Sequence, residues 1–196
     1  MPGSGMNEKL VQFFNEALAM ENAAVDRIES RVSETPIPNT KQQLQYHLEQ
    51  TIQQQERLKR LITKMGGDPT ATKASLPRIQ SMTGDTITNT VKEAAKSIVS
   101  DESRGALDAE KELLRTKEDA IIENAEVVSY KMLMEMAEKA GFSDAIAPLK
   151  QSLQEETAMV NFIMGNAPVV LNHMWSKLEQ GKTADEKEKV RVARPS

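Results

Sequence analysis

Apolar residues recur at intervals of three and four along four long stretches of the chain, and this spacing predicts four helices. The first two cover about 7–33 and 41–65. Asn39 or Thr40 can cap the start of the second helix, and Gly66 and Gly67 end it. The third runs from about Glu102 or Arg104 to Ala140 and is stopped by Gly141. The fourth follows a short turn at 142–143 and ends at 165–166. Two pairs of helices joined by short turns indicate two antiparallel hairpins.

The connection between the two hairpins is too long for a turn. Its first part, 68–77, is rich in Pro, Thr and Ser, and its second part, 78–100, has room for one or two short helices, with 86–99 the better formed. A long crossover between two helical hairpins is typical of ferritin-like bundles. The sequence therefore predicts an all-α, ferritin-like four-helix bundle with a helical crossover and a short C-terminal helix at 168–178.

Length and composition are consistent with one domain. A chain of 196 residues with 39% hydrophobic content can build a single sizeable core. We expect residues 7–180 to form this single domain. Residues 1–6 are expected to be a tag or a disordered N-terminus. Residues 181–196 are expected to be a charged flexible tail, because this segment lacks helical periodicity.

Polar residues interrupt the apolar stripe of each helix near its midpoint. Each of them alone would usually be a boundary residue with a packed stem and a solvated head. In antiparallel hairpins, however, residues equally distant from a turn lie at the same height. Glu21 is then level with Gln50 and Gln54, and Glu156 is level with Glu126. The sequence predicts one interior polar layer, formed by Glu21, His47, Gln50, Thr51, Gln54, Glu123, Glu126, Tyr130 and Glu156.

Composition excludes several classes of site and partner. The chain has no cysteine, so disulfides, thiolate metal sites and iron–sulfur clusters are excluded, and a reducing cytoplasm fits. The net charge is −4 and no basic cluster stands out, which argues against nucleic-acid binding. No apolar run is long enough to span a membrane, and no signal-peptide pattern begins the chain. We expect a cytoplasmic protein without nucleic-acid or membrane partners.

Carboxylates that share a low-dielectric interior repel one another, so they either take up protons or bind cations. Inward carboxylates in a four-helix bundle are the arrangement that holds two iron or manganese ions. On geometry alone, Glu21, Glu123, Glu126 and Glu156 predict such a centre.

The same segments resemble the YciF-type ferritin-like stress proteins. The stretch from His47 to Thr51, followed by Gln54, Arg57 and Leu58, looks like a motif of that family. So do Glu-Asn-Ala-Glu-Val-Val-Ser-Tyr at 123–130 and Leu-Gln-Glu-Glu at 153–156. The resemblance covers almost all of 8–164, and it implies a bundle related to rubrerythrin, a dinuclear metal centre, a homodimer and a link to stress responses.

Carried over by position, the resemblance implies metal ligands at Glu21, Gln54, Glu123, Glu126 and Glu156. His47 and Gln50 are further candidates for ligands or for residues beside them, although a lone histidine on a helix face is more often a packed core residue. Tyr130 could hydrogen-bond to a carboxylate, act as a one-electron donor, or be a core tyrosine with a satisfied hydroxyl. The chain departs from the family pattern at Gln50, Asn124, Ala125 and Val160.

Two functions remain open at this point. The first is a dinuclear iron or manganese protein that reacts with dioxygen or peroxide, as a ferroxidase or a peroxide-consuming enzyme. The second is a metal-free bundle that serves as a dimeric, stress-associated structural or interaction protein. The departures Gln50 and Val160 favour the second, and the carboxylates favour the first.

Overall fold

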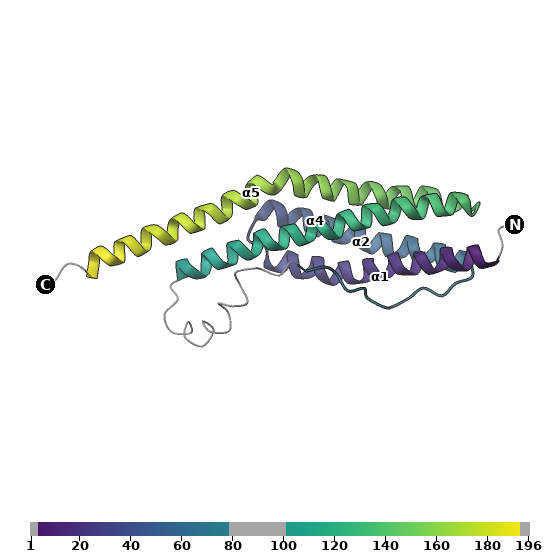
Figure 1. Cartoon of the computed structure of the whole chain (residues 1–196), viewed down its shortest axis with the longest axis horizontal. Helices are drawn as coiled ribbons and strands as arrows, with labels where there is room; N and C mark the ends of the chain where they lie inside the picture. The colour runs from purple at the N-terminus through teal and green to yellow at the C-terminus, as the bar shows by residue number, and fades with distance from the viewer. Residues whose placement is uncertain (1–3, 79–100, 193–196) are drawn as a thin grey trace. The chain divides into compact units, whose positions relative to one another are not determined.

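The computed structural model describes residues 4–78 and 101–192, and it describes the side chains at 5–78 and 108–180. These ranges are mainly helical (Figure 1). The elements in chain order are α1 (Ser4–Glu34), α2 (Pro38–Lys64), α4 (Asp101–Lys139), the 3-10 turn η1 (Ser143–Ala145) and α5 (Ile146–Val192). No strand occurs within the described ranges, so the predicted all-α class is confirmed. None of the helices in these ranges combines the length and apolar character needed to cross a bilayer.

The chain divides into two compact units. The first contains residues 1–77 and 120–164, and we call it the bundle unit. It holds α1, α2, the C-terminal half of α4, η1 and the beginning of α5. The second contains residues 78–119 and 165–196. Every residue of the candidate site described below belongs to the bundle unit.

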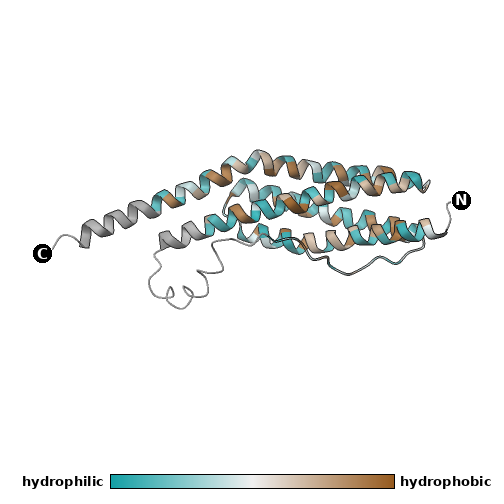
Figure 2. Cartoon of the chain, in the orientation of Figure 1, coloured by the Kyte–Doolittle hydropathy of each residue, from teal (hydrophilic) through white to brown (hydrophobic). Residues whose placement is uncertain are grey.

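Two hydrophobic clusters form the core of the bundle unit. In Figure 2, apolar and polar residues alternate along each helix, as expected when one face is buried. The larger cluster consists of Leu10, Phe14, Ala17, Leu18, Leu58, Leu61, Ile62, Tyr130, Leu133, Ala137, Ala140, Ala145 and Leu149. The smaller consists of Ala24, Ile28, Leu44, Met159 and Ile163. The predicted polar residues of α1, α2 and α5 lie between these two clusters. On each of these helices, they follow the residues of one cluster and precede those of the other.

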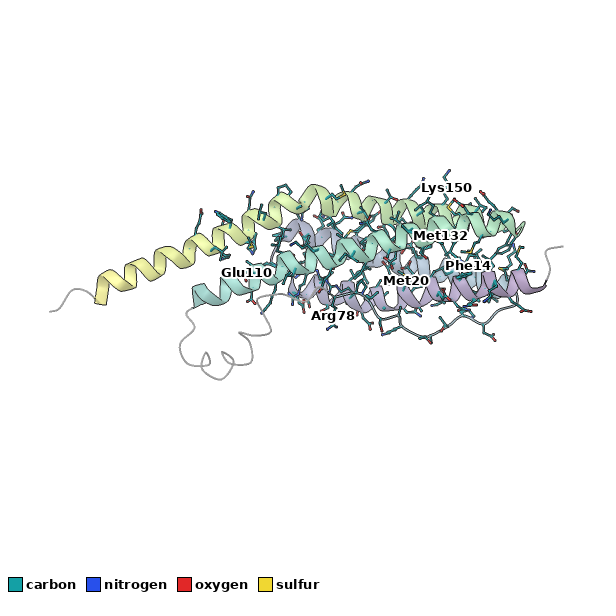
Figure 3. The ribbon with its side chains drawn as sticks, in the orientation of Figure 1. Phe14, Met20, Arg78, Glu110, Met132 and Lys150 are labelled. Atoms are coloured by element: carbon teal, nitrogen blue, oxygen red, sulfur yellow. The ribbon has the colours of Figure 1, made fainter. Side chains whose placement is uncertain are left out.

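The two faces of the helices differ as the pattern predicts. Phe14 is fully buried in the larger cluster, and its ring centroid lies 6.4 Å from that of Phe142. Lys150 is exposed and extends from the outer side of α5 (Figure 3).

Glycines end two of the helices, as predicted. Gly66 and Gly141 have φ angles of 79° and 68°, in the left-handed region that side chains with a Cβ rarely adopt. After α4, the N–H of Phe142 donates to the carbonyl of Ala137 and the N–H of Gly141 donates to that of Glu138. These two bonds are the Schellman motif, which satisfies carbonyls left open at a helix end. The chain then reverses into η1 and α5.

The helices extend further than the sequence indicates. The predicted stop at 165–166 and the separate helix at 168–178 are wrong, because α5 is continuous through Pro168. An exposed glycine destabilises a helix by only about 1 kcal/mol, and neighbouring turns can offset it. Helix α5 also continues through 182–192, where we expected a flexible tail. This segment is rich in Lys and Glu, which favour helix, and no proline interrupts it. At the N-terminus, α1 begins at Ser4, inside the segment expected to be a tag or disordered.

The second helix also begins earlier than expected. The sequence indicated a start near Lys41 with a polar cap, whereas α2 begins at Pro38 after Ile37, without a side-chain cap bond. Proline suits the first helical position because its missing N–H would have no partner in the helix. The short helix expected at 86–99 lies outside the described residues.

The beginning of the crossover lies along α1, and we call residues 68–74 the strap. The N–H of Ala74 donates to the carbonyl of Ala19 at 2.8 Å. The side chain of Asn22 donates to the carbonyls of Thr70 and Thr72 at 3.2 and 3.0 Å. Asn15 Oδ1 accepts from the N–H of Thr70 at 2.7 Å. The strap is therefore held to α1 by hydrogen bonds of its backbone.

Alanine substitutions at two exposed glycines test where these helices end. A Cβ at either Gly141 or Gly165 would meet no atom within 4 Å, so backbone conformation alone decides the effect. Gly141→Ala should lower the free energy of unfolding by about 1–2 kcal/mol, because alanine resists the left-handed region. Gly165→Ala should raise it by about 0.5–1 kcal/mol if the helix continues there. Urea unfolding of both variants measures this, and a loss of stability at Gly165 would contradict a continuous α5.

Candidate metal centre

The predicted polar residues meet in a buried layer between the two hydrophobic clusters. All four helices of the bundle unit contribute, because each carries its polar residue on the stripe that faces the core. On α1, for example, Glu21 lies one turn from both Leu18 and Ala24, which belong to different clusters. We call the following buried residues the carboxylate layer: Glu21, His47, Gln54, Glu123, Glu126 and Glu156. The most exposed of them, Glu123, has 4% of its surface accessible.

His47 joins two carboxylates of this layer. Its Nε2 lies 2.9 Å from Oε2 of Glu123 and 3.6 Å from Oε2 of Glu156. One ligand atom from each of these three residues lies within 4.8 Å of the other two, a spacing that suits a bound cation. An imidazole nitrogen with carboxylate oxygens is a donor set that iron and manganese accept.

Gln50 is half-buried and does not reach the carboxylates. Its Oε1 lies 3.4 Å from Nδ1 of His47, the ring nitrogen that faces away from the layer. An amide oxygen at this place can accept a hydrogen bond from the ring nitrogen, and such a contact helps to hold the imidazole ring in position. Of the two roles left open by the sequence, Gln50 therefore has the geometry of a residue that orients His47.

Glu21 and Tyr130 form a second contact across the layer. The hydroxyl of Tyr130 donates to Oε1 of Glu21 at 2.5 Å, and both side chains are buried. The hydrogen bond satisfies the phenol, as a buried tyrosine requires. It occupies only one of the two carboxylate oxygens of Glu21.

Gln54 lies beside Glu156. Its Nε2 donates to Oε1 of Glu156 and, at 3.1 Å, to Oε2 of Glu155. Arg57 in turn donates to both oxygens of Glu155, at 2.7 and 2.8 Å. Helical periodicity assigns no role in the site to Glu155 or Arg57, although both residues are part of the motifs described above.

Burial raises the pKa of three carboxyl groups in the layer. Burial raises the pKa of Glu126 well above its usual value, and the charges of Glu21, Glu156 and Glu123 raise it further. The pKa of Glu21 is raised by burial and by Glu156, which together outweigh its hydrogen bond from Tyr130. Each of these groups therefore resists ionising while its neighbours are charged.

The pKa of Glu156 is also raised, first by burial and then by the charge of Glu123 and a hydrogen bond with it. Contacts with His47 and Gln54 offset only part of this. Burial and the nearby Glu21 raise the pKa of Tyr130 as well, so the phenol keeps its proton.

The donor atoms of the layer fit metal ions. Among the described side chains, buried oxygens that accept no hydrogen bond include Oε2 of Glu21, Oε1 of Gln54 and Oε1 of Glu126. A buried oxygen without a partner destabilises the folded protein, and a cation would satisfy several of them together. Oxygen-rich sites suit hard ions such as manganese and ferrous iron.

The departures from the expected motif affect the layer little. Asn124 and Ala125 are exposed on α4, and the side chain of Asn124 donates to the carbonyl of Ala120. Val160 is half-buried on α5, and its hydrocarbon side chain has no oxygen to offer a cation.

Similar solved structures have the ferritin-like fold. A protein from Xanthomonas campestris pv. campestris matches with a TM-score of 0.64 at 19% identity, over 89% of this chain and 99% of its own. The Desulfovibrio desulfuricans bacterioferritin, a protein with a diiron site, matches with a TM-score of 0.63 at 14% identity, over 90% and 88%. The E. coli stress protein YciF matches with a TM-score of 0.60 at 20% identity, over 87% and 99%. The predicted ferritin-like fold is confirmed.

The relationship predicted from the motifs is also confirmed. No protein with a curated description matches the sequence. A family model described as a domain of unknown function, DUF892, matches residues 6–175, and the structural matches include YciF. This chain therefore belongs to the DUF892 family.

Proposed function

We propose that this protein binds two iron or manganese ions in the carboxylate layer and uses them to consume an oxidant, either dioxygen or peroxide. The observation that carries the proposal is a set of buried carboxylates between two hydrophobic clusters, in which Oε2 of Glu21 and Oε1 of Glu126 accept no hydrogen bond. Such groups are stable together only when protons or cations balance their charge.

The proposed ligands are those with atoms inside the layer: Glu21, His47, Gln54, Glu123, Glu126 and Glu156. Four ionised carboxylates carry the charge that balances two divalent ions. When bound, iron or manganese would supply the electrons that reduce the oxidant. The hydrophobic clusters on either side would limit access of water to this reaction.

The carboxyl groups of the layer would also bind and release protons. Because the pKa values of Glu21, Glu126 and Glu156 are raised, these carboxyls tend to hold protons when no cation is present. Binding of a divalent ion would release those protons, so affinity should rise with pH. The hydroxyl of Tyr130 would keep Glu21 in position by its hydrogen bond.

The metal-free alternative is favoured by one set of contacts. His47 with Glu123, Gln54 with Glu156, and Tyr130 with Glu21 already form pairs within the layer. A partly protonated layer held by these bonds would be a structural core, and the protein would act as a structural or interaction protein.

Several wider features belong to the proposal. The single domain at 7–180, the homodimer and the cytoplasmic location stay predictions from the sequence. A stress-related role is supported by the similarity to the E. coli stress protein YciF.

Metal content separates the two functions. Protein purified after growth with iron and manganese should contain about two ions per chain if the site is dinuclear. Glu126→Ala should reduce this to less than about one ion, because it removes a carboxylate buried in the layer. Elemental analysis gives the ratio directly.

A matched control for this variant is Glu135→Ala, which removes an exposed carboxylate from the same helix. It should leave the metal content unchanged. Full occupancy in Glu126→Ala would show that the metal is bound elsewhere, and metal-free wild-type protein would favour the structural function.

The metal-free protein should lose stability as pH rises. A carboxyl group whose pKa is raised by folding contributes its stability fully below the unfolded pKa, about 4.3, and loses it as pH rises toward the folded value. Between these values the folded state holds more protons, so each such group lowers the free energy of unfolding by up to about 1.4 kcal/mol per pH unit. Urea unfolding in the presence of a chelator, from pH 5 to 8, measures the slope.

Two comparisons make this result specific. Glu126→Leu removes one of the groups and should reduce the slope of the metal-free protein, with a gain in stability at pH 8. Saturating manganese should reverse the pH trend in the wild type. A metal-free protein whose stability did not fall over this range would contradict the charge balance argued for the layer.

A further inference from the structure

The orientation of the Gln54 side chain decides whether it can bind a cation. A glutamine amide has one oxygen that accepts and one NH₂ group that donates, and rotation by half a turn exchanges the two. Only the oxygen can bind a metal ion. The hydrogen-bond partners of the amide therefore determine whether Gln54 is a ligand or repels the ion.

Two carboxylates hold the NH₂ group of Gln54. Nε2 donates to Oε2 of Glu155 at 3.1 Å and to Oε1 of Glu156, while Oε1 of Gln54 is buried without a hydrogen-bond partner. An ionised carboxylate only accepts hydrogen bonds, so it can face the NH₂ group but not the oxygen. This orientation leaves the oxygen for a cation.

The hydrogen bond to Glu156 uses only one of the two N–H groups of the amide. Glu155 accepts from the same nitrogen, so the NH₂ group faces two carboxylate oxygens. Glu155 is therefore the second residue that fixes the orientation of the amide.

Glu155 is itself held in place, because Arg57 binds it at two points. The two guanidinium nitrogens donate to the two oxygens of Glu155 at 2.7 and 2.8 Å. Arg57 also donates to the hydroxyl of Ser152 at 2.9 Å, and Gln151 donates to Oε1 of Glu155 at 3.0 Å. Such bidentate pairs are strong and fix the plane of the carboxylate. Oε2 of Glu155 is thereby aimed at the amide of Gln54.

We propose that the Arg57–Glu155 pair is a positioning device that turns the oxygen of Gln54 toward the carboxylate layer, as a neutral ligand for a divalent cation. The role as a ligand rests on the function proposed above. The orientation of the amide does not, because it follows from hydrogen bonds of the chain alone. Glu155 and Arg57 act through Gln54 and do not themselves bind the metal.

The orientation can be measured without metal. In ¹⁵N–¹H spectra of the chelator-treated protein, the NH₂ hydrogens of Gln54 should exchange slowly with solvent. Glu155→Gln keeps the shape of the side chain but can both donate and accept, so it no longer selects the NH₂ group. Exchange should become about tenfold faster or more, the loss expected for one hydrogen bond to a charged group. Unchanged exchange in this variant would overturn the proposal.

The effect on metal binding is tested by titration with manganese(II) alone. Glu155→Gln should weaken binding about 10- to 100-fold, the range typical of residues that position a ligand. Arg57→Lys, which keeps the charge but loses the two-point contact, should weaken it in the same direction. In a Gln54→Leu background, Glu155→Gln should have no further effect, since its target is absent.

Glu56→Gln is the matched control for charge. It makes the same chemical change on the exposed side of α2, where Glu56 pairs with Lys59, and should not alter manganese binding. An equal loss from Glu155→Gln in the wild-type and Gln54→Leu backgrounds would show that Glu155 acts by charge and not through Gln54. If the wild type bound no manganese, the proposed function would fail, and the exchange measurement would still decide the orientation of the amide.

Discussion

The structure depends on the removal of several carboxylates from water. Glu21, Glu123, Glu126 and Glu156 lie where a bundle of this kind would otherwise place apolar side chains. Burying a charge without compensation is among the largest penalties a fold can carry, so the layer can exist only with protons, hydrogen bonds or cations to balance it. Burial of the two hydrophobic clusters stabilises the fold and offsets the cost of this layer. The same clusters limit the access of water that would otherwise solvate the carboxylates.

Much of the fold and the level of the site follow from periodicity. Glu21, Glu126 and Glu156 each occur on an apolar stripe, and antiparallel hairpins bring such positions to one height. The glycines at 66 and 141 mark true helix ends because their φ angles are positive. Gly165, by contrast, lies within a helix. The neighbouring turns of α5 outweigh the weak preference of glycine against helix.

The details of the site could not be predicted in the same way. Glu155 comes one residue before Glu156 on the same helix, so the two side chains leave the helix about 100° apart. Periodicity alone therefore does not bring Glu155 beside the carboxylate layer. Its position next to Gln54 depends on Arg57, which comes from another helix. Likewise, the sequence names His47 as a candidate but cannot say which ring nitrogen faces Glu123, because that depends on the side-chain rotamer and on Gln50.

The strap limits how the connection between the hairpins can vary. Its hydrogen bonds reach α1 at Asn15, Ala19 and Asn22, which span two turns of helix that include Glu21. Asn22 also accepts a hydrogen bond from Gln55 of α2. An inserted or deleted residue before Ala74 would shift bonds of the strap out of register. A change in the length of the connection after Ala74 would leave these hydrogen bonds in place.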